Sequence, residues 1–323
     1  MNKLFKNAAD RVEQKCPPIW IMRQAGRYQP SYVELKQQYT FEQMCKLPNV
    51  AAKVAMLPIN EFDFDIAILF SDILWHLEGL GLPIKFDPGP KFSTHLSDDN
   101  WKEFTDVDKA LEHLEFQSRA IEATRAALPD SKSLIGFVGG PWSLLNYAIG
   151  PNKTGHTFRT MYLKDVIIPL LKGSIRAQLK AGADKVMILD SGLGNISKNF
   201  FDKIYLDLLK EFEGMDNIGY YMRGPPSGSL AKVLKLDFDG VGIDSSEDLN
   251  KTLKKATGFV QGNFDEKMML TDNTVLLRQD IISWLDEIGD TTGWVCGLGH
   301  GIIKETPHAN VKLFVETVRS YYS

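Results

Sequence analysis

The sequence is poor in cysteine, and its three cysteines, Cys16, Cys45 and Cys296, follow no disulfide or metal-binding spacing. An odd, scattered set of this size is no disulfide framework, so it favours a reducing compartment. No His-x-Cys or Cys-x-x-Cys pair occurs, and we therefore expect no metal site. Residues 1–16 contain no apolar run, so the sequence predicts no secretory signal and a cytoplasmic location.

Long hydrophobic runs are missing too, and so is an excess of basic residues. No apolar stretch approaches the roughly 20 residues that a membrane span needs, so we expect no membrane insertion. The net charge of −4 argues against a nucleic-acid binder, which usually has a basic excess. A local arginine cluster can still bind an anionic small molecule, so that class of ligand stays open.

What the sequence does contain is an alternation of short β-rich runs with longer stretches of helical period. Two of the helical stretches extend over residues 107–128 and 197–212. A segment rich in Pro and Gly, residues 82–95, predicts an irregular insertion or a hairpin. The eight predicted strands are Pro18–Met22, Asp65–Phe70, Ser133–Val138, Lys185–Asp190, Asn217–Met222, Gly240–Asp244, Gly258–Gln261 and Gly293–Leu298.

Eight β-then-α units in about 300 residues predict an α/β protein whose chain, residues 1–323, forms one (β/α)8 TIM barrel domain. The main alternative is a doubly wound open sheet. That alternative is weakened because no GxGxxG sequence follows the first strand and no P-loop occurs. The absence of a GxSxG sequence disfavours an acyl-transfer serine, and no lysine closely follows a strand, which disfavours Schiff-base chemistry.

Polar residues follow the predicted strands, and in a TIM barrel the strand ends at this face build the active site. Such a ring favours an enzyme without naming a reaction. Two early arginines, a carboxylate and a histidine are its most informative members. The residues that follow the eight strands are Arg23, Gln24 and Arg27; Ser71 and Asp72; Gly139, Gly140 and, one turn later, Tyr147; Ser191; Arg223; Asp244; Asn263 and Asp265; and His300.

Several segments resemble the uroporphyrinogen decarboxylase family, in family order and over nearly the whole chain. The long run PPIWIMRQAGRYQP at residues 17–30 is similar to its N-terminal signature and is the most specific. Departures also occur: the sequence lacks tryptophans usual after Ser191 and Asp244, and the usual proline after Asp265. The other similar segments are ILFSDIL at 68–74, GFVGGPWSLLNY at 136–147, QGN at 261–263 and LGHGI at 298–302.

The resemblance implies a cofactor-free (β/α)8 enzyme of porphyrin and heme biosynthesis that is usually a homodimer. Its substrate is a tetrapyrrole, and the reaction removes the four acetate carboxyls of uroporphyrinogen III to give coproporphyrinogen III. By motif, the expected substrate site comprises Arg23, Gln24, Ala25, Gly26, Arg27, Asp72, Tyr147, Ser191 and His300.

The chemistry of this reaction suits those residue types. A protonated pyrrole ring accepts the electron pair that departing CO2 leaves behind, so the protein must stabilise a ring cation and hold anionic arms. We expect Asp72 to oppose the ring charge, and Arg23 and Arg27 to bind carboxylates. The plainer alternatives are that Asp72 caps the next helix and that both arginines are solvated surface groups.

His300, Tyr147 and Ser191 are expected to complete the site as hydrogen-bonding groups, with His300, Tyr147 and the arginines also counted as catalytic. Gly299 and Gly301 on either side of His300 leave room for close approach of a ligand. A ring packed on the barrel is the plainer interpretation of Tyr147. Two rival functions stay open: a zinc- or corrinoid-linked methyltransferase on the same barrel, and a non-catalytic tetrapyrrole-binding protein.

Overall fold

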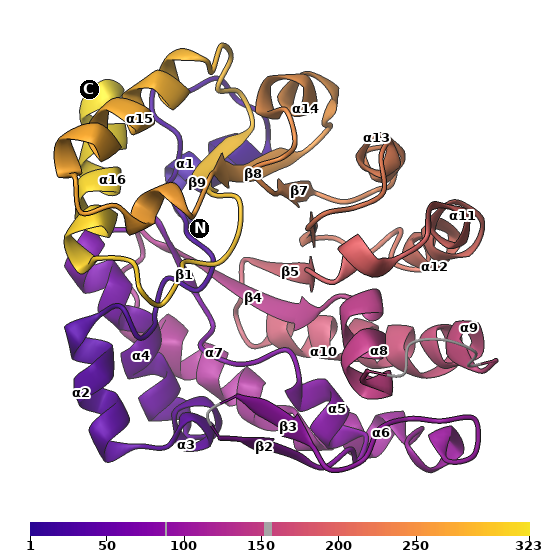
Figure 1. Cartoon of the computed structure of the whole chain (residues 1–323). Helices are drawn as coiled ribbons and strands as arrows, with labels where there is room; N and C mark the ends of the chain where they lie inside the picture. Colours follow the sequence, from indigo (N-terminus) through magenta and orange to yellow (C-terminus); the bar gives the residue numbers. More distant parts are fainter. Residues whose placement is uncertain (88, 152–156) are drawn as a thin grey trace.

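A computed structural model describes residues 1–87, 89–151 and 157–323, and its centre is a curled parallel β-sheet (Figure 1). Seven parallel strands pair in the order in which they follow one another along the chain. The α/β prediction is therefore confirmed, with strands two to eight close to their expected positions. The strands are β1 (Ile66–Ile68), β4 (Ser133–Gly139), β5 (Lys185–Asp190), β6 (Ile218–Met222), β7 (Gly240–Ile243), β8 (Phe259–Phe264) and β9 (Trp294–Leu298).

These segments form strands because they are short, apolar and covered on both faces. Every residue of β4, β5, β6, β8 and β9 is buried, as expected where helices cover a parallel sheet on one side and side chains fill its other side. The register is regular, since Ile135 pairs with Lys185 and Val186 pairs with Ile218. All carboxyl ends of the strands consequently open onto one face.

The first predicted strand, Pro18–Met22, is wrong as a strand. This segment makes a single parallel bridge, between Ile19 and Cys296 of β9. The Cys296 N–H donates to the Pro18 carbonyl at 2.9 Å, and the Asp65 N–H donates to the Ile19 carbonyl at 3.2 Å. The segment thus lies between the two edge strands. Pro17 and Pro18 have no N–H to donate, so the ladder cannot extend on the N-terminal side of Ile19.

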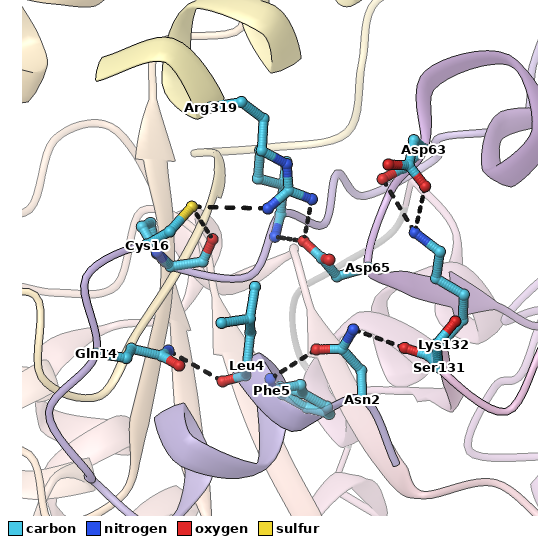
Figure 2. Close-up of polar contacts among 12 residues, drawn as sticks. Asn2, Leu4, Phe5, Gln14, Cys16, Asp63, Asp65, Ser131, Lys132 and Arg319 are labelled. Carbon is cyan, nitrogen blue, oxygen red and sulfur yellow. Dashed lines mark hydrogen bonds and ion pairs between the residues drawn. The ribbon is translucent and has the colours of Figure 1, made fainter. Parts of the chain in front are cut away.

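Asp65, just before β1, fastens this segment at the amino ends of the strands (Figure 2). Its Oδ2 atom accepts the Ile19 N–H at 2.7 Å and the Arg319 Nη2–H at 2.6 Å. Arg319 belongs to the C-terminal helix and also contacts the Cys16 sulfur at 3.7 Å. A buried carboxylate therefore joins the first segment, β1 and the end of the chain.

Helices surround the sheet, and several are shorter than the sequence predicts. The predicted helix 107–128 divides at Leu114, and 197–212 comprises α11, a π-helical turn (Phe201–Tyr205) and α12. In the described ranges no helix is long and apolar enough to cross a membrane. The helices are α1 (Lys3–Ala9), α2 (Pro30–Gln38), α3 (Phe41–Lys46), α4 (Pro48–Phe62), α5 (Trp75–Gly79), α6 (Val107–His113), α7 (Glu115–Ala127), α8 (Pro141–Ile149), α9 (Arg159–Tyr162), α10 (Ile168–Lys180), α11 (Lys198–Phe200), α12 (Leu206–Lys210), α13 (Ser229–Val233), α14 (Leu249–Lys255), α15 (Thr274–Asp286) and α16 (His308–Tyr321).

The insertion expected at 82–95 contains an antiparallel hairpin, β2 (Ile84–Phe86) and β3 (Pro90–Phe92), with Pro88 outside the described residues. In Figure 1 the hairpin lies beside α3 and α5. Aromatic rings fix it there, because Phe86 packs on Phe41 and Trp75 with ring centroids 5.0 and 4.7 Å apart. Its hairpin form was one of the two alternatives that the sequence left open.

Candidate active site

A cavity of about 680 Å³ opens at the carboxyl ends of the strands. Residues that follow the first segment, β1, β5, β6, β8 and β9 line it, so the site is where barrel-like α/β sheets place one. Of the nine residues predicted for the substrate site, eight lie on its wall, although the Gln24 side chain is fully buried behind it. They are Arg23, Gln24, Ala25, Gly26, Arg27, Asp72, Ser191 and His300.

The loop after the first segment presents both arginines. Arg23 adopts a left-handed backbone with φ of 61°, a conformation that costs a non-glycine residue on the order of 1 kcal/mol. The Gly26 N–H donates to Gln29 Oε1 at 3.1 Å, which closes the loop. Arg23 and Arg27 are exposed, and within the described residues neither side chain forms a hydrogen bond or an ion pair.

Asp72 is partly buried in the loop after β1. Its Oδ1 atom accepts the Leu74 N–H at 2.8 Å, just before α5, so the capping interpretation describes one oxygen. Among the described residues Oδ2 has no hydrogen-bond donor, and it is available to a ligand. Burial raises the pKa of Asp72 above its usual range, while the Leu74 N–H and the charge of Arg23 act in the opposite direction.

His300, after β9, is held by Tyr221 of β6. The Tyr221 hydroxyl lies 2.9 Å from the Gly299 carbonyl oxygen and 2.9 Å from His300 Nδ1. A carbonyl can only accept, so the phenolic proton goes to Gly299 and Nδ1–H donates to the tyrosine oxygen. Burial, followed by the charges of Arg223 and Arg23, lowers the pKa of His300 to about 3. The imidazole is therefore neutral near pH 7.

The glycines on either side of His300 leave room for protein groups. A Cβ atom at Gly301 would lie 2.5 Å from Arg23 Cδ, and one at Gly299 would lie 2.4 Å from the Ser245 nitrogen. Gly301 thus admits the Arg23 side chain and Gly299 admits backbone, while Gly301 also lies on the cavity wall. That the glycines also make space for a ligand stays a prediction.

Ser191 reaches the cavity from a rigid strand end. The preceding residue, Asp190, is fully buried and accepts hydrogen bonds from the backbone N–H and hydroxyl of Ser143 and from the hydroxyls of Tyr205 and Tyr220. The Ser143 hydroxyl oxygen also accepts the Gly192 N–H at 2.8 Å. Ser191 therefore lies between two neighbours that hydrogen bonds hold in place, Asp190 and Gly192. Burial raises the pKa of Asp190, while its hydrogen bonds act in the opposite direction.

Two predicted residues differ from expectation. Tyr147 does not line the cavity; it is 42% exposed on α8, with its ring stacked near Phe92 at 6.4 Å. The remaining side chains of α8 are mostly buried, so Tyr147 takes the outer face. Gln24 is fully buried and its Nε2–H donates to the Ile66 carbonyl at 3.0 Å, so its amide serves the fold.

The cavity wall also contains residues that had no role in the sequence-based site, among them Tyr221, Arg223 and Glu266. Arg223 was visible as the residue after the fifth predicted strand. Tyr221 could have been found from its place near the end of that strand, where side chains reach the ligand face. Nothing in the sequence pairs Glu266 with Arg223, because they come from different strand ends.

No cluster of three or more His, Cys, Asp or Glu side chains suited to a metal occurs in the part of the chain that the structure describes. Cys296 is fully buried inside β9, and burial raises the pKa of its thiol. Cys296 is therefore a core residue.

Comparison with known proteins agrees with this geometry. The profile of the family described as uroporphyrinogen decarboxylase (URO-D) matches residues 1–321. The chain belongs to the uroporphyrinogen decarboxylase family. It is 33% identical to the uroporphyrinogen decarboxylase of Anaeromyxobacter dehalogenans, over 99% of both chains, and 35% identical to that of Orientia tsutsugamushi strain Ikeda, over 100% of this chain and 99% of the relative.

Among solved structures, a methyltransferase from Methanosarcina mazei is similar to this uroporphyrinogen decarboxylase family member with a TM-score of 0.78. The likeness covers 100% of both chains at 17% sequence identity. At that identity the likeness concerns the fold alone, so it gives no weight to the methyltransferase alternative.

Proposed function

We propose that this protein is a uroporphyrinogen decarboxylase that converts uroporphyrinogen III into coproporphyrinogen III. The observation that carries the proposal is one cavity of about 680 Å³ that holds a partly buried carboxylate, Asp72, and two arginines, Arg23 and Arg27, that have no side-chain partner among the described residues. Its substrate combines a ring system that becomes cationic with eight carboxylates, and the cavity offers a complement to both. Family membership supports the same reaction.

Each decarboxylation has a balanced sequence of steps. A proton adds to the pyrrole carbon next to the acetate-bearing carbon, and the ring becomes cationic. The bond to the carboxylate then breaks, its electron pair neutralises the ring as an exocyclic methylene, and CO2 leaves. A second proton converts the methylene into a methyl group, and the first proton departs to restore the pyrrole. One proton is consumed for each CO2 released.

In this proposal Asp72 stabilises the cationic ring. Its free Oδ2 accepts pyrrole N–H groups, and its charge opposes the positive charge that develops after protonation. Preorganised charge in a site with little water is usually a large contribution to catalysis. Arg23 and Arg27 bind carboxylate arms, because a guanidinium donates two parallel hydrogen bonds to a carboxylate.

His300 and Ser191 add neutral hydrogen-bonding groups. With Nδ1–H directed at Tyr221, the Nε2 lone pair of His300 can accept a pyrrole N–H, and the Ser191 hydroxyl can donate to an arm. Tyr147, predicted as a catalytic and binding residue, has no part in the proposed site because it lies off the cavity wall.

We also infer that the chain forms a single (β/α)8 barrel domain in which Pro18–Met22 occupies the eighth strand position. Its hydrogen bonds to Cys296 and Asp65 support that inference. Catalysis without a cofactor, a homodimeric assembly and a cytoplasmic location complete the proposal. They follow from the family resemblance and the cysteine pattern.

The test is anaerobic incubation of the purified, chelator-treated protein with uroporphyrinogen III, followed by counting the carboxyl groups of the product. Coproporphyrinogen III is the expected product. A folded protein that binds the tetrapyrrole but leaves all eight carboxyls intact would instead be a carrier. A requirement for added zinc would favour the methyltransferase alternative.

A further inference from the structure

Arg223 stands on the part of the cavity wall that faces the Arg23–Arg27 loop. It directly follows β6, the middle strand of the seven. The loop that carries Arg23 and Arg27 follows the segment that bridges the two outer strands, β1 and β9. In a curled sheet the middle strand lies across from the place where the edges meet, so Arg223 and Arg23 approach the cavity from opposite sides.

The guanidinium of Arg223 is held loosely. Its one ion pair among the described residues is with Glu266 Oε1, at 3.8 Å, which is beyond hydrogen-bonding distance. Its side chain is 44% exposed, whereas that of Glu266 is 7% exposed. The structural arginines differ, since Arg125 and Arg319 donate to carboxylates at 2.7 and 2.6 Å. The N–H groups of Arg223 thus stay available on the cavity side.

The charge of Arg223 acts on the centre of the cavity. After burial, Arg223 is the largest contribution to the lowered pKa of His300, ahead of Arg23. It also opposes the effect of burial on the pKa of Tyr221. Positive groups that follow different segments, Arg223 after β6 and Arg23 after Pro18–Met22, therefore act on the same His300–Tyr221 pair.

We propose that Arg223 is a further substrate-binding residue, which holds a carboxylate arm on the wall opposite Arg23 and Arg27. The inference rests on the proposed function. Carboxylates surround a tetrapyrrole on all sides, so a macrocycle centred at Asp72 directs arms toward both walls. Two arginines on one wall cannot reach arms on the other. The Glu266 carboxylate, 3.8 Å away, does not saturate the donors of the guanidinium.

Four variants separate this role from that of a structural ion pair. We expect Arg223→Gln to raise the KM for uroporphyrinogen on the order of 10-fold, because a charged hydrogen bond is lost, with little change in kcat. Arg223→Lys should restore part of the affinity. Glu266→Gln should leave KM unchanged or lower it, since it removes a competing carboxylate. Arg278→Gln, at an exposed arginine of α15, is the matched control and should leave KM unchanged.

Arg223→Gln leaves the buried Glu266 carboxylate without its partner and could therefore unfold the protein. The double variant Arg223→Gln/Glu266→Gln tests the proposal in that case. It leaves no unpaired charge and should show the same rise in KM. An unchanged KM in the folded variants would overturn the proposal. Equal rises in KM for Arg223→Gln and Glu266→Gln, with equal losses of thermal stability, would also overturn it.

Fluorescence titrations with uroporphyrin and coproporphyrin measure binding without turnover. Uroporphyrin carries acetate and propionate arms, whereas coproporphyrin carries propionates only. Weaker binding of both by Arg223→Gln would identify the arm as a propionate, and weaker binding of uroporphyrin alone would identify it as an acetate. If the wild-type protein binds uroporphyrin but releases no CO2, the decarboxylation proposal fails while the titrations still test Arg223. Unchanged binding of both porphyrins would overturn the inference.

Discussion

Tyr221 lies in β6, the middle strand of the sheet, and His300 follows β9, an edge strand, yet the tyrosine oxygen lies 2.9 Å from His300 Nδ1. Because the Gly299 carbonyl takes the phenolic proton, Nδ1 carries the hydrogen and Nε2 carries the lone pair. The tautomer of a cavity histidine is thereby set by a strand residue that is not part of the recognised motif.

This relationship predicts that His300 stays neutral far below the usual histidine range. Its pKa is lowered to about 3, whereas in the unfolded chain it is about 6.5. Between those values the unfolded state takes up a proton that the folded state does not. The free energy of unfolding should therefore fall as the pH decreases below 6.5, by up to about 1.4 kcal/mol per pH unit.

Nitrogen NMR of labelled His300 checks the tautomer directly. We expect protonated Nδ1 and unprotonated Nε2 from pH 8 to about pH 5. In His300→Asn the free energy of unfolding should depend less steeply on pH, by the equivalent of one proton. His76, which is also buried with a lowered pKa of about 4, accounts for a further proton that the unfolded state takes up. A doubly protonated ring at pH 6 would contradict the geometry.

The arginine loop predicts a loss of substrate affinity. Arg27→Gln removes a guanidinium that has no partner of its own in the described structure, so it should raise KM on the order of 10-fold without lowering stability. Arg27→Lys keeps the charge but loses the planar pair of donors, so its KM should lie between that of the wild type and that of Arg27→Gln. Steady-state kinetics check the order, with Arg278→Gln as the control. A glutamine variant with wild-type KM would remove Arg27 from the site.

The Asp65–Arg319 pair predicts a stability effect that is independent of the site. Arg319→Gln leaves the Asp65 carboxylate buried, and among the described residues the Ile19 N–H is then its one donor. Breaking a buried pair costs about 3–5 kcal/mol; because the Arg319 side chain is 28% exposed, we expect about 2 kcal/mol. Urea unfolding measures the loss, and Lys312→Gln on the exposed side of α16 is the control. An unchanged midpoint would show that the first segment is held by other contacts.

The family motif implies that Tyr147 takes part in the reaction, whereas its position in the structure predicts that it does not. Since its ring stacks near Phe92 outside the cavity wall, Tyr147→Phe should leave kcat/KM for uroporphyrinogen near the wild-type value. A large fall in kcat would mean that the hydroxyl reaches the substrate during turnover, as the family motif implies.

Most of the sheet could be predicted because its strands are buried on both faces and bounded by turns. The prediction failed where backbone chemistry, rather than apolar pattern, decides. Pro17 and Pro18 look compatible with a strand, yet they cannot donate ladder hydrogen bonds. The apolar period of the helix expected from 107 to 128 continues through Leu114. The sequence pattern therefore gives no sign that the structure divides there into α6 and α7.

The candidate site likewise contains residues that the sequence places correctly and residues that it does not. Arg23, Arg27, Asp72 and His300 follow strand positions closely, so counting from a strand end places them on the cavity. Tyr147 lies a helical turn further on, where its direction depends on how α8 packs. The pairing of Arg223 with Glu266 needs the spatial order of two strand ends, which no local pattern contains.

In the proposed mechanism the charge of Asp72 drives decarboxylation. The most direct measurement is CO2 release from uroporphyrinogen III by the wild-type protein and by Asp72→Asn under the same anaerobic conditions, with uroporphyrin binding and thermal unfolding as checks on the variant. We expect four CO2 per substrate for the wild type and a rate at least about 100-fold lower for the folded variant. A folded Asp72→Asn protein with a near-normal rate would contradict it.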